Sequence, residues 1–125
     1  MTFPRDVLDL WDQTDEIDVE TSRGGADAQV HRTTIWIVVD GDEAFIRSVR
    51  GPAGRWYREL TANPSGAIHA GDQRVAVRAS VAVDPASVAR VSAAISKKYH
   101  SRWPGPTAAM LQPDTLPTTL RLEPA

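Results

Sequence analysis

Apolar and polar residues alternate through most of the chain, and this pattern predicts β-strands as the dominant element. The clearest strand covers residues 33–39, where β-branched and aromatic side chains follow one another. The same alternation predicts further strands over residues 16–21, 44–49, 67–70, 74–83 and 116–122. Asp40-Gly41 and Gly71-Asp72 predict hairpin turns, because glycine adopts positive φ without strain.

Helical spacing of apolar residues occurs in three shorter segments. Residues 4–12 carry an apolar stripe and form the expected helix of the N-terminal segment, 1–14. Residues 55–62 predict a short helix that ends ahead of Pro64, because the residue before a proline avoids the helical region. The strongest helix begins after Asp84, whose carboxylate suits an N-cap.

Residues 101–117 contain four prolines and predict an irregular, proline-rich arm before the last strand. The two hairpins require antiparallel pairing, and closing such a sheet removes its exposed edges. The sequence therefore predicts one domain over residues 1–125, mainly β (α+β). We expect a six-stranded antiparallel barrel with two or three flanking helices.

Composition narrows the classes of function. The 125 residues carry a net charge of −2, which argues against nucleic acid as the partner. The chain has no cysteine, which excludes disulfides and thiolate catalysis, and the three histidines match no metal motif, so no metal site is expected. No apolar run is long enough to span a membrane, and the acidic N-terminus does not resemble a signal peptide, so a cytoplasmic location is expected.

Four arginines fall within residues 47–58, while residues 6–27 are strongly acidic. Ser48, Arg50 and Arg55 lie in a glycine-containing segment that leads into a helix, where free backbone N–H groups and arginine forks suit a phosphate. Pairing about the first hairpin would place Arg32 and Thr34 beside this segment. The alternative is a solvated arginine patch paired with the acidic N-terminal segment.

Other candidate residues are aromatic or titratable. Trp56 is expected to anchor its short helix, and Trp103 to cover a pocket or to pack on a partner subunit. His31 precedes the strongest strand and could face the phosphate site as a proton-transfer group. No nucleophile motif or dinucleotide-binding motif is present.

Four stretches resemble the FMN-binding split-barrel superfamily, which includes pyridoxamine-phosphate-oxidase-like proteins and deazaflavin-dependent nitroreductases. They are HRTTIW at 31–36, the hairpin at 40–41, SVRG at 48–51 and RWYRELTANP at 55–64. The last is similar to the W-Y-x-N-L-x-A-N-P helix of those families. The chain as a whole resembles a small bacterial family placed near them.

This resemblance implies a split barrel that forms a homodimer, with FMN or a deazaflavin bound at the subunit interface. The implied cofactor-binding residues are Arg32, Thr34, Ser48, Arg50, Arg55 and Trp56. Trp36 and Tyr57 would line the ring and substrate pocket. Glu59 stands where relatives commonly carry asparagine, and the loop has arginines in place of lysines, so the choice between the two cofactors stays open.

The function expected first is a flavin- or deazaflavin-dependent oxidoreductase acting on a small organic substrate, with hydride chemistry supplied by the cofactor. One alternative is a barrel that holds flavin, haem or another small molecule without turnover. Another is a cofactor-free isomerase or cyclase, because a fold does not determine a function. In that case His31, Tyr57 or Tyr99 would handle protons, and no catalytic residue is assigned.

Overall fold

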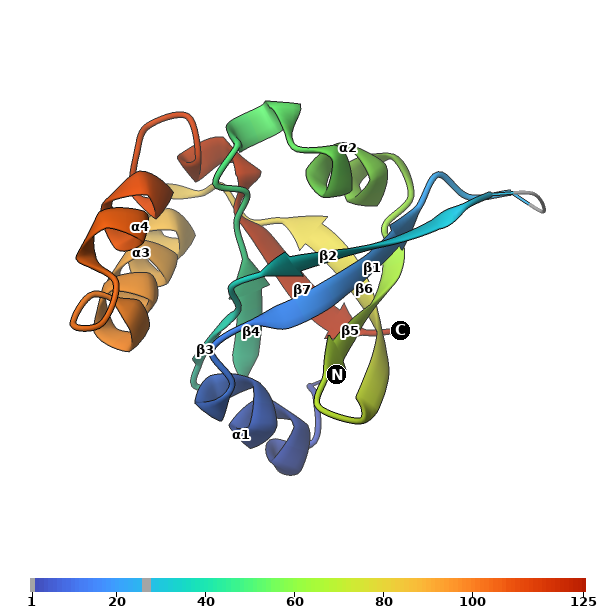
Figure 1. Cartoon of the computed structure of the whole chain (residues 1–125), viewed down its shortest axis with the longest axis horizontal. Helices are drawn as coiled ribbons and strands as arrows, with labels where there is room; N and C mark the ends of the chain where they lie inside the picture. Colours follow the sequence, from blue (N-terminus) through green and yellow to red (C-terminus); the bar gives the residue numbers. More distant parts are fainter. Residues whose placement is uncertain (1, 26–27) are drawn as a thin grey trace.

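The computed structural model describes residues 2–25 and 28–125, and its centre is one antiparallel sheet of seven strands (Figure 1). The strands are β1 (Ile17–Ser22), β2 (Val30–Ile35), β3 (Val38–Asp40), β4 (Glu43–Ile46), β5 (Ser65–Ala70), β6 (Gln73–Val81) and β7 (Leu120–Pro124). Their order is β2-β1-β5-β6-β7-β4-β3. The α-helices are α1 (Arg5–Gln13), α2 (Arg55–Ala62), α3 (Pro85–Tyr99) and α4 (Pro104–Met110).

The prediction of six strands is wrong, because the run 33–39 is two strands. The strand pattern is interrupted at Trp36 and Ile37: β2 pairs with β1, and β3 pairs with β4. Two residues thus link the two edges of the sheet, which curls into a half-barrel. Arg32 consequently lies opposite Glu20 on β1, so the expectation that pairing across the first hairpin would place Arg32 beside Arg50 is also wrong.

Both predicted hairpins are present. Asp40 pairs with Glu43, so the first turn is Gly41-Asp42, one residue later than expected. The second turn is Gly71-Asp72, between β5 and β6. The glycines have φ of 65° and 56°, the region in which glycine is favoured.

Residues 101–117 are more regular than predicted, and the helix count rises to four. Pro104 and Pro106 fall in the first turn of α4, where a missing N–H removes no intrahelical hydrogen bond. Residues 116–118 form a 3-10 turn, so the last strand begins later than predicted. The Thr118 and Thr119 hydroxyls donate to carbonyl oxygens three residues earlier, which favours a turn there.

The apolar core has two parts. Inside the barrel, α1 covers one end and α2 the other (Figure 1), with Trp11 and Leu60 buried against the sheet interior. Outside it, α3 packs over β3 and β4 through Val91, Ile95 and Tyr99. Asp84 caps α3 as predicted, since it accepts a hydrogen bond from the Ser87 N–H at 3.0 Å.

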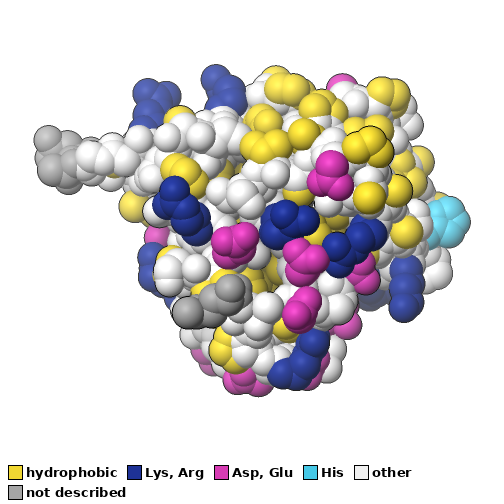
Figure 2. All heavy atoms as spheres, turned by 180° about the vertical axis from the view of Figure 1, so that it is seen from behind, with side chains coloured by type: hydrophobic (Ala, Val, Ile, Leu, Met, Phe, Trp, Pro, Cys, Tyr) yellow, Lys and Arg dark blue, Asp and Glu magenta, His cyan; other side chains and the backbone are white. Residues whose placement is uncertain are grey.

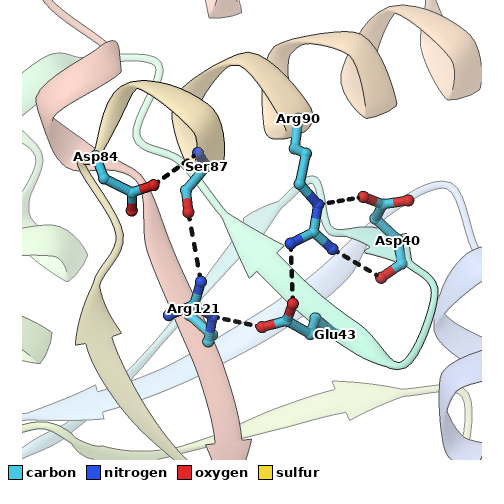
Figure 3. A network of polar contacts seen from close by, with 6 residues as sticks. All are labelled: Asp40, Glu43, Asp84, Ser87, Arg90 and Arg121. Carbon is cyan, nitrogen blue, oxygen red and sulfur yellow. Dashed lines mark hydrogen bonds and ion pairs between the residues drawn. The ribbon is translucent and has the colours of Figure 1, made fainter.

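A polar network fixes α3 against the sheet (Figure 3). Arg90 of α3 contacts Asp40 and Glu43 at the two sides of the first hairpin. Arg121 of β7 forms an ion pair with the same Glu43, at 2.6 Å between Nε and Oε2. The network thereby joins three segments that are distant in the sequence.

Charged side chains of both signs are interspersed on the face seen from behind, and apolar side chains gather toward its upper edge (Figure 2). Over residues 2–25 and 28–125, none of the helices is long and apolar enough to cross a bilayer. The same residues contain no group of three side chains suited to holding a metal ion.

Candidate functional site

A mostly apolar hollow with a volume of about 360 Å³, called the main cavity below because of its aromatic walls and not its size, lies where α2 and α4 meet the ends of β1, β2 and β4. Its lining residues are Glu16, Thr34, Ile35, Trp36, Arg47, Val49, Trp56, Trp103, Pro106 and Met110. The walls are mostly apolar and carry three tryptophans with few polar groups. Concave sites of this size and character are typical of small-molecule binding.

An aromatic stack forms one side of the main cavity. Trp36 lies parallel to Tyr99, with ring centroids 3.8 Å apart, and Trp103 lies 6.3 Å from Trp36. Burial raises the pKa of Tyr99 well above its ordinary value. Its hydroxyl donates to the Asp15 carbonyl oxygen at 2.7 Å. Tyr99 therefore supports the wall as a neutral phenol and does not line the cavity.

Arg47 is a buried cation of the main cavity with no carboxylate partner among the described residues. Its guanidinium donates to neutral oxygens of Thr119, Ser92, Met110 and Val88 at 2.9–3.2 Å. Burial lowers the pKa of Arg47 to about 10, so it is charged at neutral pH. Arg47 belongs to the arginine cluster of residues 47–58, and its burial was not predicted from the sequence. The available signal was its position two residues after Phe45, directly after the apolar strand β4.

Arg32 and Thr34 share one partner on the neighbouring strand. The Asp18 carboxylate accepts from Arg32 Nη2 at 3.1 Å and from the Thr34 hydroxyl at 2.7 Å. Thr34 also borders the main cavity, whereas Arg32 does not. Of this pair, only the threonine is thus placed beside the cavity.

Ser48 is buried and holds the loop that follows β4. Its N–H donates to the Thr118 hydroxyl at 2.9 Å, and its own hydroxyl donates to the Gly51 carbonyl oxygen at 2.9 Å. Gly54 packs so closely that a Cβ there would lie 2.6 Å from Ser48 Oγ. This close contact explains why residue 54 is a glycine. The Ser48 hydroxyl already donates its proton to Gly51, so it has no proton left to donate to a ligand.

The start of α2 lies between two hollows. Its N-cap, Gly54, provides no side-chain cap, so the first N–H groups have no side-chain acceptor. Arg50 and Arg55 are exposed and make no ion pair within the described residues. Trp56 is buried against the main cavity, while half-buried Tyr57 lies outside its lining.

The second pocket lies on another side of α2. It is lined by Arg23, Gly24, Ala28, Gln29, His31, Arg55 and Glu59. Buried Glu59 accepts from the Thr21 hydroxyl at 2.8 Å and contacts His31 Nδ1 at 3.0 Å. Burial acts to raise the pKa of Glu59, but the hydrogen bonds from His31 and Thr21 outweigh it and lower the pKa.

The predicted site residues therefore do not gather around a single hollow. Thr34, Trp36 and Trp56 surround the main cavity, and Arg55 lines the second pocket. Sequence reasoning missed the pairing of Glu59 with His31, although it singled out each residue. They are 28 positions apart, so no local spacing connects them.

The curled antiparallel sheet with its flanking helices is a split-barrel fold. Solved structures with this fold include HutZ, described as the heme storage protein from Vibrio cholerae (TM-score 0.69, 15% identity, 100% of this chain and 92% of that chain). A proposed pyridoxamine 5'-phosphate oxidase from Listeria innocua also matches (0.61, 17%, 94% and 87%). So does an F420-H2 dependent reductase, FDR-A (0.64, 13%, 86% and 93%).

The chain belongs to the family described as "Uncharacterized protein conserved in bacteria (DUF2255)", whose model matches residues 7–122. No curated protein matches the chain.

Proposed function

We propose that this protein binds FMN or a deazaflavin and acts as an oxidoreductase on a small organic substrate. The observation that carries the proposal is the main cavity, an aromatic-walled hollow beside the uncapped start of α2. A phosphate-bearing cofactor with a planar ring needs both of these features side by side.

The apolar part of the main cavity suits a planar ring. Trp36, Trp56 and Trp103 offer aromatic faces for packing, and the Thr34 hydroxyl offers one polar contact. These tryptophans would also exclude water from the bound ring. Trp36 is the residue we assign to the substrate side, whereas Tyr57, which the sequence also suggested for this role, lies outside the lining of the main cavity.

The phosphate end is assigned to the loop between β4 and α2. Arg50 follows Val49, which lines the main cavity, and the backbone N–H groups of Arg55 and Trp56 begin α2. A helix start with free N–H groups and an adjacent arginine favours an anion. Ser48 contributes by shaping the loop, and Arg32 contributes only if its guanidinium leaves Asp18.

The bound cofactor would supply the hydride chemistry, and the chain would supply position and charge. Arg47 brings an unneutralised positive charge to the wall of the cavity, which favours a ligand that carries or gains negative charge there. Because four hydrogen bonds fix this guanidinium, its charge is already in place before a ligand binds.

The heme storage protein among the structural neighbours raises haem as a second candidate. Haem iron needs an axial ligand, most often histidine. Among the described residues, no histidine lines the main cavity: His31 and His69 each contact a glutamate elsewhere, and His100 is exposed just after the end of α3. This arrangement favours a flavin-type cofactor over haem.

Spectral titration with FMN, F420 and hemin tests the proposal. We expect saturable binding of FMN or F420. Binding should be at least about tenfold weaker in Arg50→Ala, since a hydrogen bond to a charged group contributes about 1.5–3 kcal/mol. Arg58→Ala is the matched control, because Arg58 is also an exposed arginine but lies within α2 and not in the loop between β4 and α2 that is assigned to the phosphate.

Three outcomes would contradict the proposal. Binding of hemin alone would support a haem-holding barrel, and failure to bind any of the three would support a cofactor-free pocket protein. Binding of FMN that no hydride donor can reduce would support a non-catalytic carrier.

A further inference from the structure

His31 and Glu59 form a hydrogen-bonded pair at the wall of the second pocket. Glu59 lies in α2 and is only 4% exposed, while His31 lies in β2 and is partly exposed. His31 Nδ1 is 3.0 Å from both carboxylate oxygens of Glu59. Thr21, which is opposite His31 in the β1–β2 ladder, donates to the same carboxylate.

This geometry fixes the imidazole tautomer. A carboxylate facing Nδ1 accepts a hydrogen bond, so the proton lies on Nδ1 and the lone pair of the neutral ring on Nε2. Within the described part of the chain, His31 makes no hydrogen bond other than those to Glu59. Nε2 is thus free to exchange a proton with a molecule in the pocket.

Positive charge surrounds the pair. Arg55 and Arg23 line the second pocket, and neither makes an ion pair with an acid among residues 2–25 and 28–125. Together with Glu59 and His31, they are the charged groups among the described residues that line the pocket. An arginine pair beside a proton-exchanging imidazole suits a small molecule with a carboxylate or phosphate group.

We propose that His31 is a proton-transfer residue for a small anionic ligand in the second pocket, that Glu59 positions it, and that Arg55 holds the anion. In the protonated ring, Nε2 gives its proton to an oxygen or nitrogen of the ligand, and Nδ1 keeps its proton toward Glu59. In the neutral ring, Nε2 accepts a proton from the ligand. This inference goes beyond the oxidoreductase proposal and requires no cofactor.

The chain contains a second histidine–glutamate pair that provides a comparison. His69 Nε2 contacts Glu20 at 2.7 Å, and the same carboxylate also binds Arg74. His69 lines none of the hollows described above. If the His31–Glu59 pair were purely structural, His31 should respond to added anions no more than His69 does.

The first measurement is the ¹⁵N NMR spectrum of the imidazole side chains. We expect neutral His31 to be the Nδ1–H tautomer in the wild type. In Glu59→Asn, the shorter side chain should release the ring, and the Nε2–H tautomer should appear. A wild-type ring with its proton on Nε2 would overturn the proposal.

The second measurement is a titration with inorganic phosphate and with acetate, followed at His31 Nε2. We expect saturable shifts at His31 and none at His69, because only the former borders the pocket. Affinity should fall at least about tenfold in Arg55→Ala and be unchanged in Arg58→Ala.

Proton uptake separates proton transfer from simple packing. Titration calorimetry of the same probes in buffers of different ionisation enthalpy should show a proton exchanged on binding near neutral pH in the wild type. The exchange should be absent in His31→Gln and present in His69→Gln. If the ¹⁵N signal of His31 in the wild-type protein does not shift with either phosphate or acetate, the inference is overturned, whatever the outcome of the flavin titration.

Discussion

Arg47 shows how one side chain can serve both the fold and the cavity. Its guanidinium joins β4 to the backbone of α3 and α4 and to Thr119. Arg47→Met keeps much of the volume but leaves these acceptors without donors, so we expect a loss of about 3 kcal/mol in the free energy of unfolding. Urea denaturation measures this loss. Arg78→Met, on an exposed position of β6, is the control and should change stability by under about 0.5 kcal/mol.

Glu20 provides a pH-dependent contribution to stability. Arg74, opposed by burial and helped by His69, lowers the pKa of Glu20 from 4.5 to about 2. Because the folded pKa is the lower one, the contribution is complete above about pH 4.5 and disappears as pH falls toward 2. A shift of this size corresponds to a few kcal/mol at most.

We therefore expect wild type and Glu20→Gln to differ in urea midpoint at pH 6 and to converge near pH 2. Asp9→Asn serves as the comparison, because Asp9 pairs with Arg5 on an exposed helix surface and such pairs contribute about 0.3–0.5 kcal/mol. Equal differences for Glu20→Gln at both pH values would contradict the assignment.

Individual site residues were the hardest feature to read from the sequence. Arginines and hydroxyls near 48–55 were recognisable as anion-binding types, but their partners were not. Asp18 engages Arg32, and His31 engages Glu59, through contacts that depend on which strands pair. Strand pairing is a tertiary property, and side-chain spacing does not encode it.

Elements with local causes were predictable. The glycine turns, the Asp84 cap and the stop of α2 before Pro64 each depend on a few adjacent residues. The interruption at Trp36 and Ile37 was not predictable, because both residues favour strands and the break is imposed by pairing with two different neighbours. Regular structure after residue 101 was missed because the prolines indicated an irregular arm, whereas the first turn of a helix such as α4 tolerates proline.

The turn before α2 depends on Gly51. Its φ is +65°, and a Cβ there would lie 2.9 Å from the Asp114 carbonyl oxygen. Gly41 has the same φ and open space around it. Gly51→Ala should therefore lower the free energy of unfolding by about 1–3 kcal/mol more than Gly41→Ala, because only Gly51 adds a clash to the backbone strain. Thermal unfolding of both variants gives the comparison, and equal losses would show that the loop relaxes freely.

At the scale of the molecule, exposed apolar side chains at the opening of the main cavity favour association with a second copy of the chain. Val49 is 54% exposed and Trp103 is 37% exposed, and both line this cavity. We expect a homodimer in which a second copy covers this rim, so Val49→Glu should shift sedimentation toward the monomer and weaken flavin binding. Val30→Glu, at a similarly exposed valine on β2, should leave both unchanged. A wild-type monomer that binds FMN would exclude this arrangement.

The two-residue link between β2 and β3 also sets the alignment of the whole sheet. A slip of β2 along β1 by one residue would invert the side chains of β2 and pull Trp36 away from Tyr99. The stacking of Trp36 on Tyr99 thus stabilises the alignment of β2 with β1, and Trp36 also forms part of the wall of the main cavity. A ligand bound against Trp36 would stabilise this alignment further. Ligand binding in the main cavity should therefore slow amide hydrogen exchange in the two edge strands, β2 and β3.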